Sequence, residues 1–403
     1  MIVEISWRNI WRSKGRSLVV IAAIAIGIWA LVFLMGFMKA WLIVYVQNQI
    51  KYETSHIQIH HPDFKKDLDV NFTIGSVKDI LSELTSKDYV AVVERSMCNG
   101  MVASPRKAQG AQIRGIIPEK EMALNHIDSF IVEGDYFKGI KRNPIVMGYK
   151  LAEKLRVKHR SKIVLTFQDS KGQIVSGAFR ICGILKSNFP TINEMYVQVR
   201  KEDLNRLLGI GDDYHEIAIL MKDGTDEEAE ADRLAARYPG LLVEDWKQIA
   251  PEMEYFLESS AGFMWVLQVI IMIALIFGII NTMLMSVLER FKELGMLKAV
   301  GMDKWRIFRM ILMETLFLAI IGSPIGVFLG WATTTYFATY GLDLSNYSEG
   351  LEMYGYDSIL YPMVDISNYV QAVIGVFITS VIGAIYPALK AIRLKPIEAL
   401  HKI

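Results

Sequence analysis

Four long uncharged stretches dominate this sequence of 403 residues. They run from Ser17 to Met38, Ser259 to Leu288, Thr315 to Leu342 and Ile366 to Leu389. A helix needs about 20 apolar residues to cross the roughly 30 Å of hydrocarbon in a bilayer. Helices of soluble proteins keep a polar face, so four helices without a charge on any face do not fit a soluble bundle. The sequence therefore predicts a membrane α-helical protein with four transmembrane helices.

The composition agrees with a membrane protein that carries one large polar insertion. Apolar residues make up 52% of the chain, charged residues make up 22%, and the mean hydropathy is +0.28. Because most of the charge lies in the middle of the chain, a disordered chain, a collagen-like repeat and a disulfide-stapled mini-domain are excluded. The formal net charge of +1 argues against a general nucleic-acid binder, which would be strongly basic.

The first uncharged stretch is predicted to be an anchor that stays in the membrane. A secretory signal has an apolar region of about 7–15 residues that ends in a small-residue cleavage site. The stretch here is longer and continues into the mostly apolar residues 39–45. We therefore interpret it as an uncleaved first span.

Lysine and arginine predict the orientation, because short segments rich in them stay in the cytoplasm. Three segments are basic, through Arg8, Arg12, Lys14 and Arg16, through Arg290, Lys292, Lys298, Lys304, Arg306 and Arg309, and through Lys390, Arg393, Lys395 and Lys402. The segment between the third and fourth stretches has no lysine or arginine, and carries Asp343, Glu349, Glu352, Asp357 and Asp365. Both termini are thus predicted to be cytoplasmic, with the largest insertion outside.

These patterns divide the chain into successive parts. The predicted parts are a cytoplasmic amphipathic helix (1–16), a first transmembrane helix and stalk (17–46), a mixed α/β domain outside the membrane (47–258), a second transmembrane helix (259–288), a cytoplasmic connecting helix (289–306), a third transmembrane helix (311–342), an external acidic loop (343–365), a fourth transmembrane helix (366–389) and a cytoplasmic tail (390–403).

The external domain is predicted to mix strands and helices. Residues 162–167 and 177–184 read as two strands joined by a turn at 168–173, and residues 56–60 and 194–199 read as further strands. Residues 150–155 and 226–237 read as helices, the second with an acidic first turn. The order of parts predicts a large mixed α/β extracytoplasmic domain between helices 1 and 2.

Motifs for catalysis or metal binding are missing from the sequence. It contains no G-x-x-x-x-G-K-[ST], G-x-S-x-G or H-E-x-x-H, so a P-loop ATPase is not expected in this chain. His60, His61 and Asp63 lie close together, but neighbouring strand residues point to opposite faces and the spacing fits no metal motif. Cys98 and Cys182 both fall outside the membrane, where they could form a disulfide or remain buried thiols. No metal and no catalytic residue are predicted.

The cytoplasmic segment 289–302 is partly amphipathic. Leu294, Leu297 and Val300 follow a helical stripe, with Glu293 and Lys298 beside it. Such a helix either lies on the lipid surface or docks into another protein. The residue pattern alone leaves both interpretations open.

Longer sequence runs resemble the membrane subunits of the MacB/FtsX superfamily of ABC transporters. The resemblance lies in residues 281–302, in Glu314 followed by 322–326, and in Tyr386 to Ala391 with Pro396 and 398–400 after it. Residues 7–12, 56–62 and 148–155 are similar to the LolC/LolE-like branch. The resemblance covers the whole chain and the order of its parts.

The resemblance implies a permease of the bacterial inner membrane that works as a dimer, with an identical or related second permease chain. Two copies of a separate ABC ATPase would bind ATP and Mg, so that this chain needs no cofactor of its own. ATPase closure would move the external domains by mechanotransmission, without a channel through the membrane.

The resemblance also implies a site for the ATPase. Segment 290–302 would be the coupling helix, in which the apolar stripe supplies anchors, Glu293 and Lys298 fix the register, and Gly295 and Gly301 allow close approach or a turn. The predicted coupling residues are Glu293, Leu294, Gly295, Leu297, Lys298, Val300 and Gly301.

Two single residues of the third span, Glu314 and Pro324, also allow predictions. Glu314 either reaches the membrane interface or pairs with Arg309 or with a basic residue of the N-terminal helix, which would lie on the cytoplasmic surface with Trp7, Ile10 and Trp11 on one side. Pro324 is expected to break or kink the third span.

For the LolC/LolE-like branch the cargo is a lipoprotein, which would pass to a periplasmic carrier. Its acyl chains would find shelter at Phe33, Phe37, Trp41, Phe263, Met264 and Val266, unless these side chains only face lipid or pack between spans. The rival functions are a MacB-like exporter of peptides or antibiotics and an FtsX-like signalling protein that controls a cell-wall hydrolase. A membrane-bound enzyme finds no support, because the sequence has no catalytic constellation.

Overall fold

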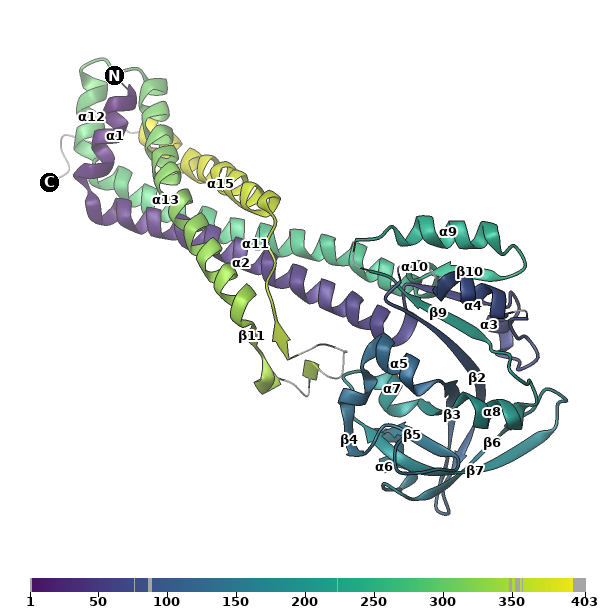
Figure 1. Cartoon of the computed structure of the whole chain (residues 1–403). Helices are drawn as coiled ribbons and strands as arrows, with labels where there is room; N and C mark the ends of the chain where they lie inside the picture. Colours follow the sequence, from purple (N-terminus) through teal and green to yellow (C-terminus); the bar gives the residue numbers. More distant parts are fainter. Residues whose placement is uncertain are drawn as a thin grey trace. The chain divides into compact units, whose positions relative to one another are not determined.

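The computed structural model describes residues 2–75, 77–85, 89–222, 224–347, 350–351, 356 and 358–393. It divides the chain into two compact units (Figure 1). The membrane unit comprises Met1–Leu42, Leu257–Asp343 and Ile359–Ile403, and the external unit comprises Ile43–Phe256 and Leu344–Ser358. Part of the predicted acidic loop thus belongs to the external unit. The predicted tail from residue 394 onward, with Pro396 and Glu398, lies outside the described residues, as do Glu349, Glu352 and Asp357.

Long helices build the membrane unit. They are α1 (Ile2–Arg12), α2 (Lys14–Gln49, shared with the external unit), α11 (Pro251–Glu289, also shared), α12 (Phe291–Ala299), α13 (Lys304–Tyr340) and α15 (Ile366–Ile392), with a short pair of strands, β11 (Leu342–Asp343) and β12 (Ile359–Leu360). Within the described residues, four helices are long and apolar enough to cross a membrane: α2 with its extension to Thr54, α11, α13 and α15. The four predicted spans are confirmed as helices.

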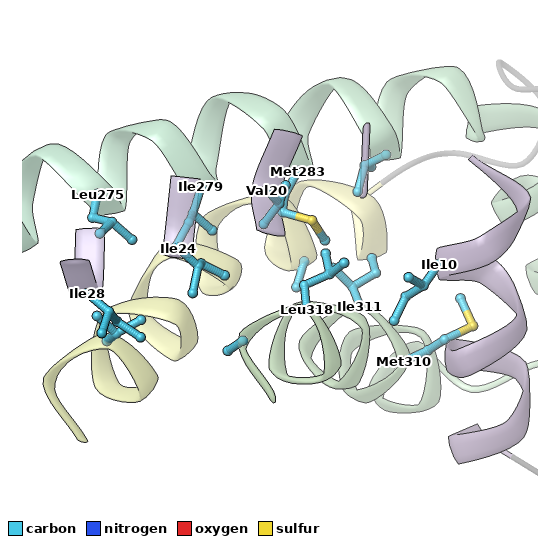
Figure 2. Packing of buried hydrophobic residues seen from close by; sticks show 14 of the residues in the cluster. Ile10, Val20, Ile24, Ile28, Leu275, Ile279, Met283, Met310, Ile311 and Leu318 are labelled. Carbon is cyan, nitrogen blue, oxygen red and sulfur yellow. The ribbon is translucent and has the colours of Figure 1, made fainter. Parts of the chain in front are cut away.

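The core of the membrane unit lies where α2, α11, α13 and α15 meet (Figure 2). Ile24 and Ile28 of α2 are completely buried, and Figure 2 shows Ile24 beside Ile279 of α11 and Ile28 beside Leu275 of α11. Transmembrane helices gain little from hydrophobicity alone and depend on close packing, so small residues at their contacts matter. In α13, a Cβ added at Gly326 would lie 2.7 Å from the Ala25 carbonyl oxygen, which shows how closely α13 approaches α2.

Two details of this unit differ from expectation. Helix α13 continues through Pro324, so the expected break is absent, because a proline removes only one intrahelical hydrogen bond and the neighbouring helices hold the segment in place. The alternative of a kink at Pro324 stays a prediction. Helix α1 does not present Ile10 on the same surface as its tryptophans. Ile10 is only 3% exposed and packs in the core, whereas Trp7 and Trp11 remain about half exposed, and the Ser6 hydroxyl donates to the Met310 carbonyl.

The external unit is built on a ten-stranded sheet. Its strands are β1 (Ile57–His60), β2 (Ala91–Ala103), β3 (Ala108–Ile116), β4 (Ile131–Gly134), β5 (Pro144–Gly148), β6 (Lys162–Gln168), β7 (Ile174–Leu185), β8 (Tyr196–Arg200), β9 (Glu216–Leu220) and β10 (Leu242–Asp245). The order is β10-β1-β9-β2-β3-β8-β5-β7-β4, and β6 pairs with both β2 and β7. Strands β2, β3, β8, β5, β7 and β6 therefore close a ring.

The external unit also contains short helices and turns. They are the π-helical turn η1 (Ile50–Thr54), α3 (Phe64–Asp67), α4 (Val77–Thr85), α5 (Pro118–Asn125), the 3₁₀ turns η2 (Ile127–Phe130) and η3 (Ser345–Tyr347), α6 (Tyr149–Leu155), α7 (Pro190–Glu194), α8 (Lys201–Leu208), α9 (Glu227–Arg237) and α10 (Trp246–Ile249). Large side chains such as Ile113, Leu165 and Phe179 fill the ring. A second cluster, which includes Ile57 and Leu234, lies beneath the extension β9-β1-β10.

The local predictions for the external unit are confirmed with small shifts of the boundaries. Strands β6 and β7 form the expected antiparallel hairpin, and the Asp169 carboxylate accepts hydrogen bonds from the backbone amides of Lys171 and Gln173 in its turn. Asp226 caps α9 by accepting from the Ala229 amide. The mixed α/β domain between the first and second spans is therefore confirmed.

Candidate functional site

The turn between α11 and α13 forms a corner of the membrane unit that carries α12. Arg290 is the non-helical residue between the end of α11 and the start of α12. After α12, Gly301 adopts a φ of 96°, which favours glycine, and Asp303 caps α13 by accepting from the Trp305 amide. The expected turn at Gly301 is thus present, and it reverses the chain directly after α12.

The predicted coupling residues divide into buried and open positions. Leu294 is only 3% exposed, Gly295 is buried as well, and Leu297 packs against the same core, so this part of the stripe faces the chain's own helices. The membrane unit uses Leu294 and Leu297 to hold α12 in place, and their role as anchors for an ATPase stays a prediction. Val300 is 84% exposed and lies on the open side of the corner, together with Met296 and Trp305. Contact of this open side with an ATPase remains a prediction.

The two charged residues expected to fix the register contact their own chain. The Glu293 carboxylate lies 2.7 Å from the Arg12 guanidinium of α1. The Lys298 ammonium donates to the Ile392 carbonyl at the end of α15, at 3.1 Å. These contacts hold α12 against the first and last helices of the unit.

Glu314 is buried, and its partner differs from both expected ones. Its carboxylate accepts two hydrogen bonds from one terminal nitrogen of Arg290, at 3.0 and 3.2 Å, and a third from the Asn9 amide at 2.6 Å. The side chain is 7% exposed, so it does not reach the interface. Neither Arg309, which is on the exposed side of α13, nor a basic residue of the N-terminal segment 1–16 is a hydrogen-bond partner of Glu314. The turn at Arg290 could not be placed beside Glu314 from spacing alone.

The residues predicted to shelter acyl chains all lie in the membrane unit, on α2 and α11. Phe33 packs edge-on against Phe337 with ring centroids 6.0 Å apart, and Phe37 contacts Trp41 at 5.6 Å. On α11, Phe263 and Val266 are each more than half exposed, and Met264 is partly buried. Their contact with a lipid-like substrate stays untested.

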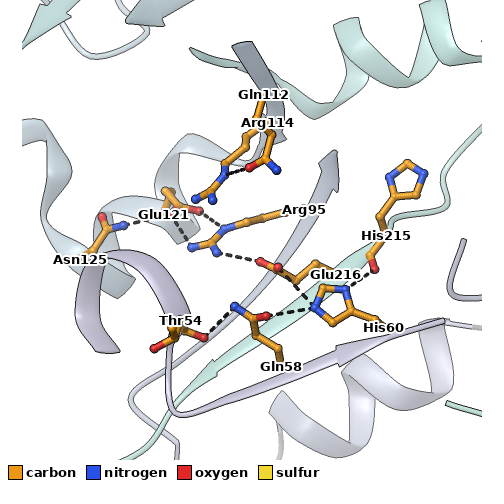
Figure 3. A network of polar contacts seen from close by, with 10 residues as sticks. All are labelled: Thr54, Gln58, His60, Arg95, Gln112, Arg114, Glu121, Asn125, His215 and Glu216. Atoms are coloured by element: carbon orange, nitrogen blue, oxygen red, sulfur yellow. Dashed lines mark hydrogen bonds and ion pairs between the residues drawn. The ribbon is translucent and has the colours of Figure 1, made fainter. Parts of the chain in front are cut away.

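A buried polar network crosses the external unit (Figure 3). Arg95 of β2 donates to both carboxylate oxygens of Glu121 in α5, at 2.7 and 3.1 Å, and to Glu216 of β9 at 2.8 Å. All three side chains are at most 5% exposed. The other oxygen of Glu216 lies 3.6 Å from His60, which contacts Gln58, and Gln58 donates to the Thr54 carbonyl of η1. One chain of polar contacts thus joins α5 to η1.

Charge and burial act against each other in this network. Burial by itself would raise the pKa of Glu216, but the charges of Arg95 and His60 outweigh it and hold the pKa below its usual value. Burial lowers the pKa of His60. Sequence reasoning missed this network. The sequence feature that could have revealed it is a charged residue inside an otherwise apolar strand, as at Arg95 in β2 and Glu216 in β9.

The histidines and cysteines have structural partners. His61 stacks on Phe72, and its Nδ1 accepts from the Asp63 amide. Cys98 and Cys182 are buried free thiols, and burial raises their pKa to about 12 and about 11. Within the described residues, no group of three His, Cys, Asp or Glu side chains is placed to hold a metal ion.

The external unit also has an open pocket of about 580 Å³. Aromatic side chains from four segments line it, namely Tyr45, Phe189, Phe256 and Tyr356. The Tyr45 ring lies 5.1 Å from that of Phe256 and 5.6 Å from that of Tyr356. Glu194, which pairs with Lys150 and Lys154, adds a charged wall. The pocket combines apolar surface with a few polar groups, as small-molecule and peptide sites do.

Two family models match successive parts of the chain. The model described as a MacB-like periplasmic core domain matches residues 17–237, more than half of the chain, and the model described as an FtsX-like permease C-terminal domain matches residues 265–396. The chain belongs to the MacB/FtsX family of ABC transporter permeases. It is therefore a multi-pass membrane protein with an extracellular domain.

Several named relatives resemble this permease over different shares of its length. An uncharacterized ABC transporter permease of Methanocaldococcus jannaschii is 27% identical over 67% of this chain and 65% of its own. The lipoprotein-releasing system transmembrane protein LolC of Xylella fastidiosa is 23% identical over 73% of both chains. A macrolide export ATP-binding/permease protein MacB of Marinobacter nauticus is 31% identical over 42% of this chain and 24% of its own. The match thus spans just under two thirds of the first relative and about a quarter of the MacB relative.

Among solved structures, the periplasmic region of MacB from Actinobacillus actinomycetemcomitans is similar with a TM-score of 0.36 and 11% identity, over 52% of this chain and 97% of that one.

Proposed function

We propose that this permease is the transmembrane subunit of an ABC transporter that extracts lipoproteins from the inner membrane for delivery toward the outer membrane. ATP hydrolysis by a separate ATPase would drive it, and motion of the external unit would do the work. Two ATPase copies and a second permease chain, identical or related, would complete the assembly. Both termini and the α12 corner would then face the cytoplasm.

The observation that carries the mechanical part of the proposal is the length of α2 and α11. Helix α2 runs from Lys14 to Gln49 and α11 from Pro251 to Glu289, and both are shared between the two units. Each is far longer than the roughly 20 residues needed to span a bilayer. Because a helix transmits displacement along its axis, a push at the α12 corner has a covalent, hydrogen-bonded route outward through α11.

Two observations support lipoprotein as the cargo. The LolC relative aligns over 73% of both chains, so its match is too long to be confined to the external domain alone. The external unit also offers the aromatic pocket around Tyr45, which suits an apolar cargo that has left the bilayer. Removing acyl chains from a bilayer costs about 0.8 kcal/mol for each CH₂ group, so extraction of a lipid anchor needs an energy source.

A second function has support of its own. The match to the MacB-like periplasmic core over residues 17–237 favours an exporter subunit that drives peptides or antibiotics outward. Such a subunit would work with an external adaptor and a duct in the outer membrane. An FtsX-like signalling role would instead require a cell-wall hydrolase as partner.

Mass spectrometry of the gently solubilised complex separates these functions. We expect an ABC ATPase together with triacylated lipoproteins, and the permease sequences present would distinguish a homodimer from a heterodimer. An ATPase with an adaptor, or with a hydrolase, and without lipoprotein would refute lipoprotein release. A complex that contains no ATPase would refute the proposed coupling at α12.

A further inference from the structure

The cluster of Asn9, Arg290 and the buried Glu314, which we name the clamp, joins three elements at one point. Asn9 comes from α1, Arg290 from the turn between α11 and α12, and Glu314 from α13. We propose that the clamp makes α1, α12 and the cytoplasmic end of α13 move as one body when the ATPase acts. The proposal rests on the proposed function, in which the displacement begins at α12.

The geometry of the clamp resists relative motion. Both oxygens of Glu314 contact the same Arg290 nitrogen, and one of them also accepts from Asn9. A planar, charged donor and a carboxylate prefer a defined geometry, so sliding one helix past another breaks charge-assisted hydrogen bonds. Because Glu314 is buried, salt and water screen these contacts far less than they screen a surface pair. Separating them would leave a charge without a partner in an apolar setting.

The position of Arg290 makes the clamp relevant to transmission. Arg290 is the non-helical residue between α11 and α12, with φ of −94° and ψ of 18°, and it is the point at which α12 could swing relative to α11. The clamp fixes this residue to Glu314 and, through Asn9, to α1. The Ser17 hydroxyl donates to the Ile10 carbonyl and ties α1 in turn to the start of α2. A displacement of α12 is therefore passed on to both α2 and α11, and a flexible turn at Arg290 does not absorb it.

The neighbouring pair of Arg12 and Glu293 provides a matched comparison. It joins α1 to α12 directly, at 2.7 Å, but the Arg12 side chain is 69% exposed and that of Glu293 35%. Exposed ion pairs contribute little to holding two elements together. If the clamp acts through burial and geometry, loss of the Arg12 side chain has little effect on how firmly α1 is held to α12. Loss of the Glu314 charge then has a large effect on it.

The test measures the distance between α1 and α12 in the full chain bound to the ATPase that co-purifies with it. Spin labels on introduced cysteines at the exposed positions Arg8 and Met296 report this distance, and the native Cys98 and Cys182 are buried and stay unlabelled. We expect a narrow distance distribution that ATP with Mg does not change. The variant E314Q should broaden it, and R12Q should not.

Two further measurements distinguish a loss of mechanical transmission from a loss of folding stability in E314Q. In E314Q, ATP hydrolysis should continue, while the ATP-dependent change in hydrogen exchange of the external unit should be lost. The charge-swapped double variant E314R with R290E should restore the narrow distribution only in part. Asn9 can donate or accept, but the new carboxylate at 290 would repel Glu293, which lies 3.4 Å from the Arg290 Nε. If E314Q does not accumulate, N9A and R290K keep the charges and should give intermediate broadening.

An unchanged narrow distribution in E314Q, or an intact ATP response of its external unit, would overturn the clamp. These outcomes differ from a failure of the proposed function, in which the unmodified chain binds no ATPase. In that case the distances without nucleotide still decide whether the cluster holds α1 to α12.

Discussion

At the scale of single residues, the hydrogen bonds of His215 make the stability of the external unit depend on pH. Its Nδ1 accepts from the Met97 amide at 2.9 Å, and its Nε2 donates to the Val70 carbonyl at 3.1 Å. Phe64 stacks on the ring with centroids 4.9 Å apart. Only the neutral imidazole satisfies both contacts, because a proton on Nδ1 would face an N–H donor. Burial lowers the pKa of His215 accordingly.

We therefore predict that the external unit loses stability as the pH falls below about 6.5, the usual pKa of histidine. The unfolded chain binds a proton there that folded His215 excludes, so the stabilisation is complete above that pH and is lost on acidification. Each such histidine adds a slope of up to about 1.4 kcal/mol per pH unit. His60, whose pKa burial also lowers, adds to the effect.

Hydrogen exchange of the amides of β2 and β9 in the full chain measures this slope, after correction for the intrinsic exchange rate. The variant H215Q should flatten the dependence between pH 7 and 5, whereas H126N, at an exposed histidine, should leave it unchanged. A slope that H215Q leaves as steep as before would show that His215 does not carry it.

At the scale of helices and strands, three glycines of α13 make close contacts with α2. A Cβ at Gly322 would lie 2.8 Å from a side-chain carbon of Ile24, and one at Gly330 would lie 2.9 Å from Val32. Gly326 lies between them and meets the backbone of α2. These glycines recur every fourth residue, so they share one face of α13 and let the two helices approach.

We predict that G326V separates α2 from α13 and destabilises the membrane unit by about 1–3 kcal/mol, the usual cost of overpacking. The obstructing atoms belong to the Ala25 backbone and the Ile28 Cβ, which cannot rotate away. The control is G278V on α11, where an added Cβ has open space within 4 Å. Thermal unfolding of the purified chain in detergent should show a lower midpoint for G326V than for G278V. Equal midpoints would refute the role of this contact.

Sequence patterns predicted the elements better than their contacts. Apolar length alone located the four spans, and alternation with a turn at Asp169 located the β6–β7 hairpin, because both signals are local. The partner of Glu314 was missed because Arg290 reaches it only after α11 and α13 pack together. The stripe of Leu294 and Leu297 was correctly apolar, but periodicity does not say whether an apolar face meets its own chain or a partner.

At the scale of the whole molecule, the permease should place its two hydrophilic regions on opposite sides of the membrane. In the predicted topology, the chain leaves the membrane for the external unit after the first span and returns at the second, and the α12 corner follows at the cytoplasmic end of the second span. We predict that a cysteine at Arg106, in the exposed turn between β2 and β3, reacts with a membrane-impermeant maleimide in intact cells. A cysteine at the exposed Lys304 should react only after permeabilisation.

The parent chain is the control for this labelling, because burial raises the pKa of Cys98 to about 12 and keeps both native thiols unreactive. Labelling of both introduced cysteines from outside, or the reverse pattern, would contradict the orientation deduced from lysine and arginine.

The strand order also determines when the external unit can fold during synthesis. β1, at Ile57–His60, pairs with β9 and β10, which end at Leu220 and Asp245. Such pairing of distant segments cannot begin until the later strands are available. Nearly the whole insertion must therefore be made and exported through the translocation machinery as an unfinished chain, tethered by its first span. Helix α11 begins at Pro251, only a few residues after β10, so the second span enters the bilayer at almost the moment when the exported domain becomes complete.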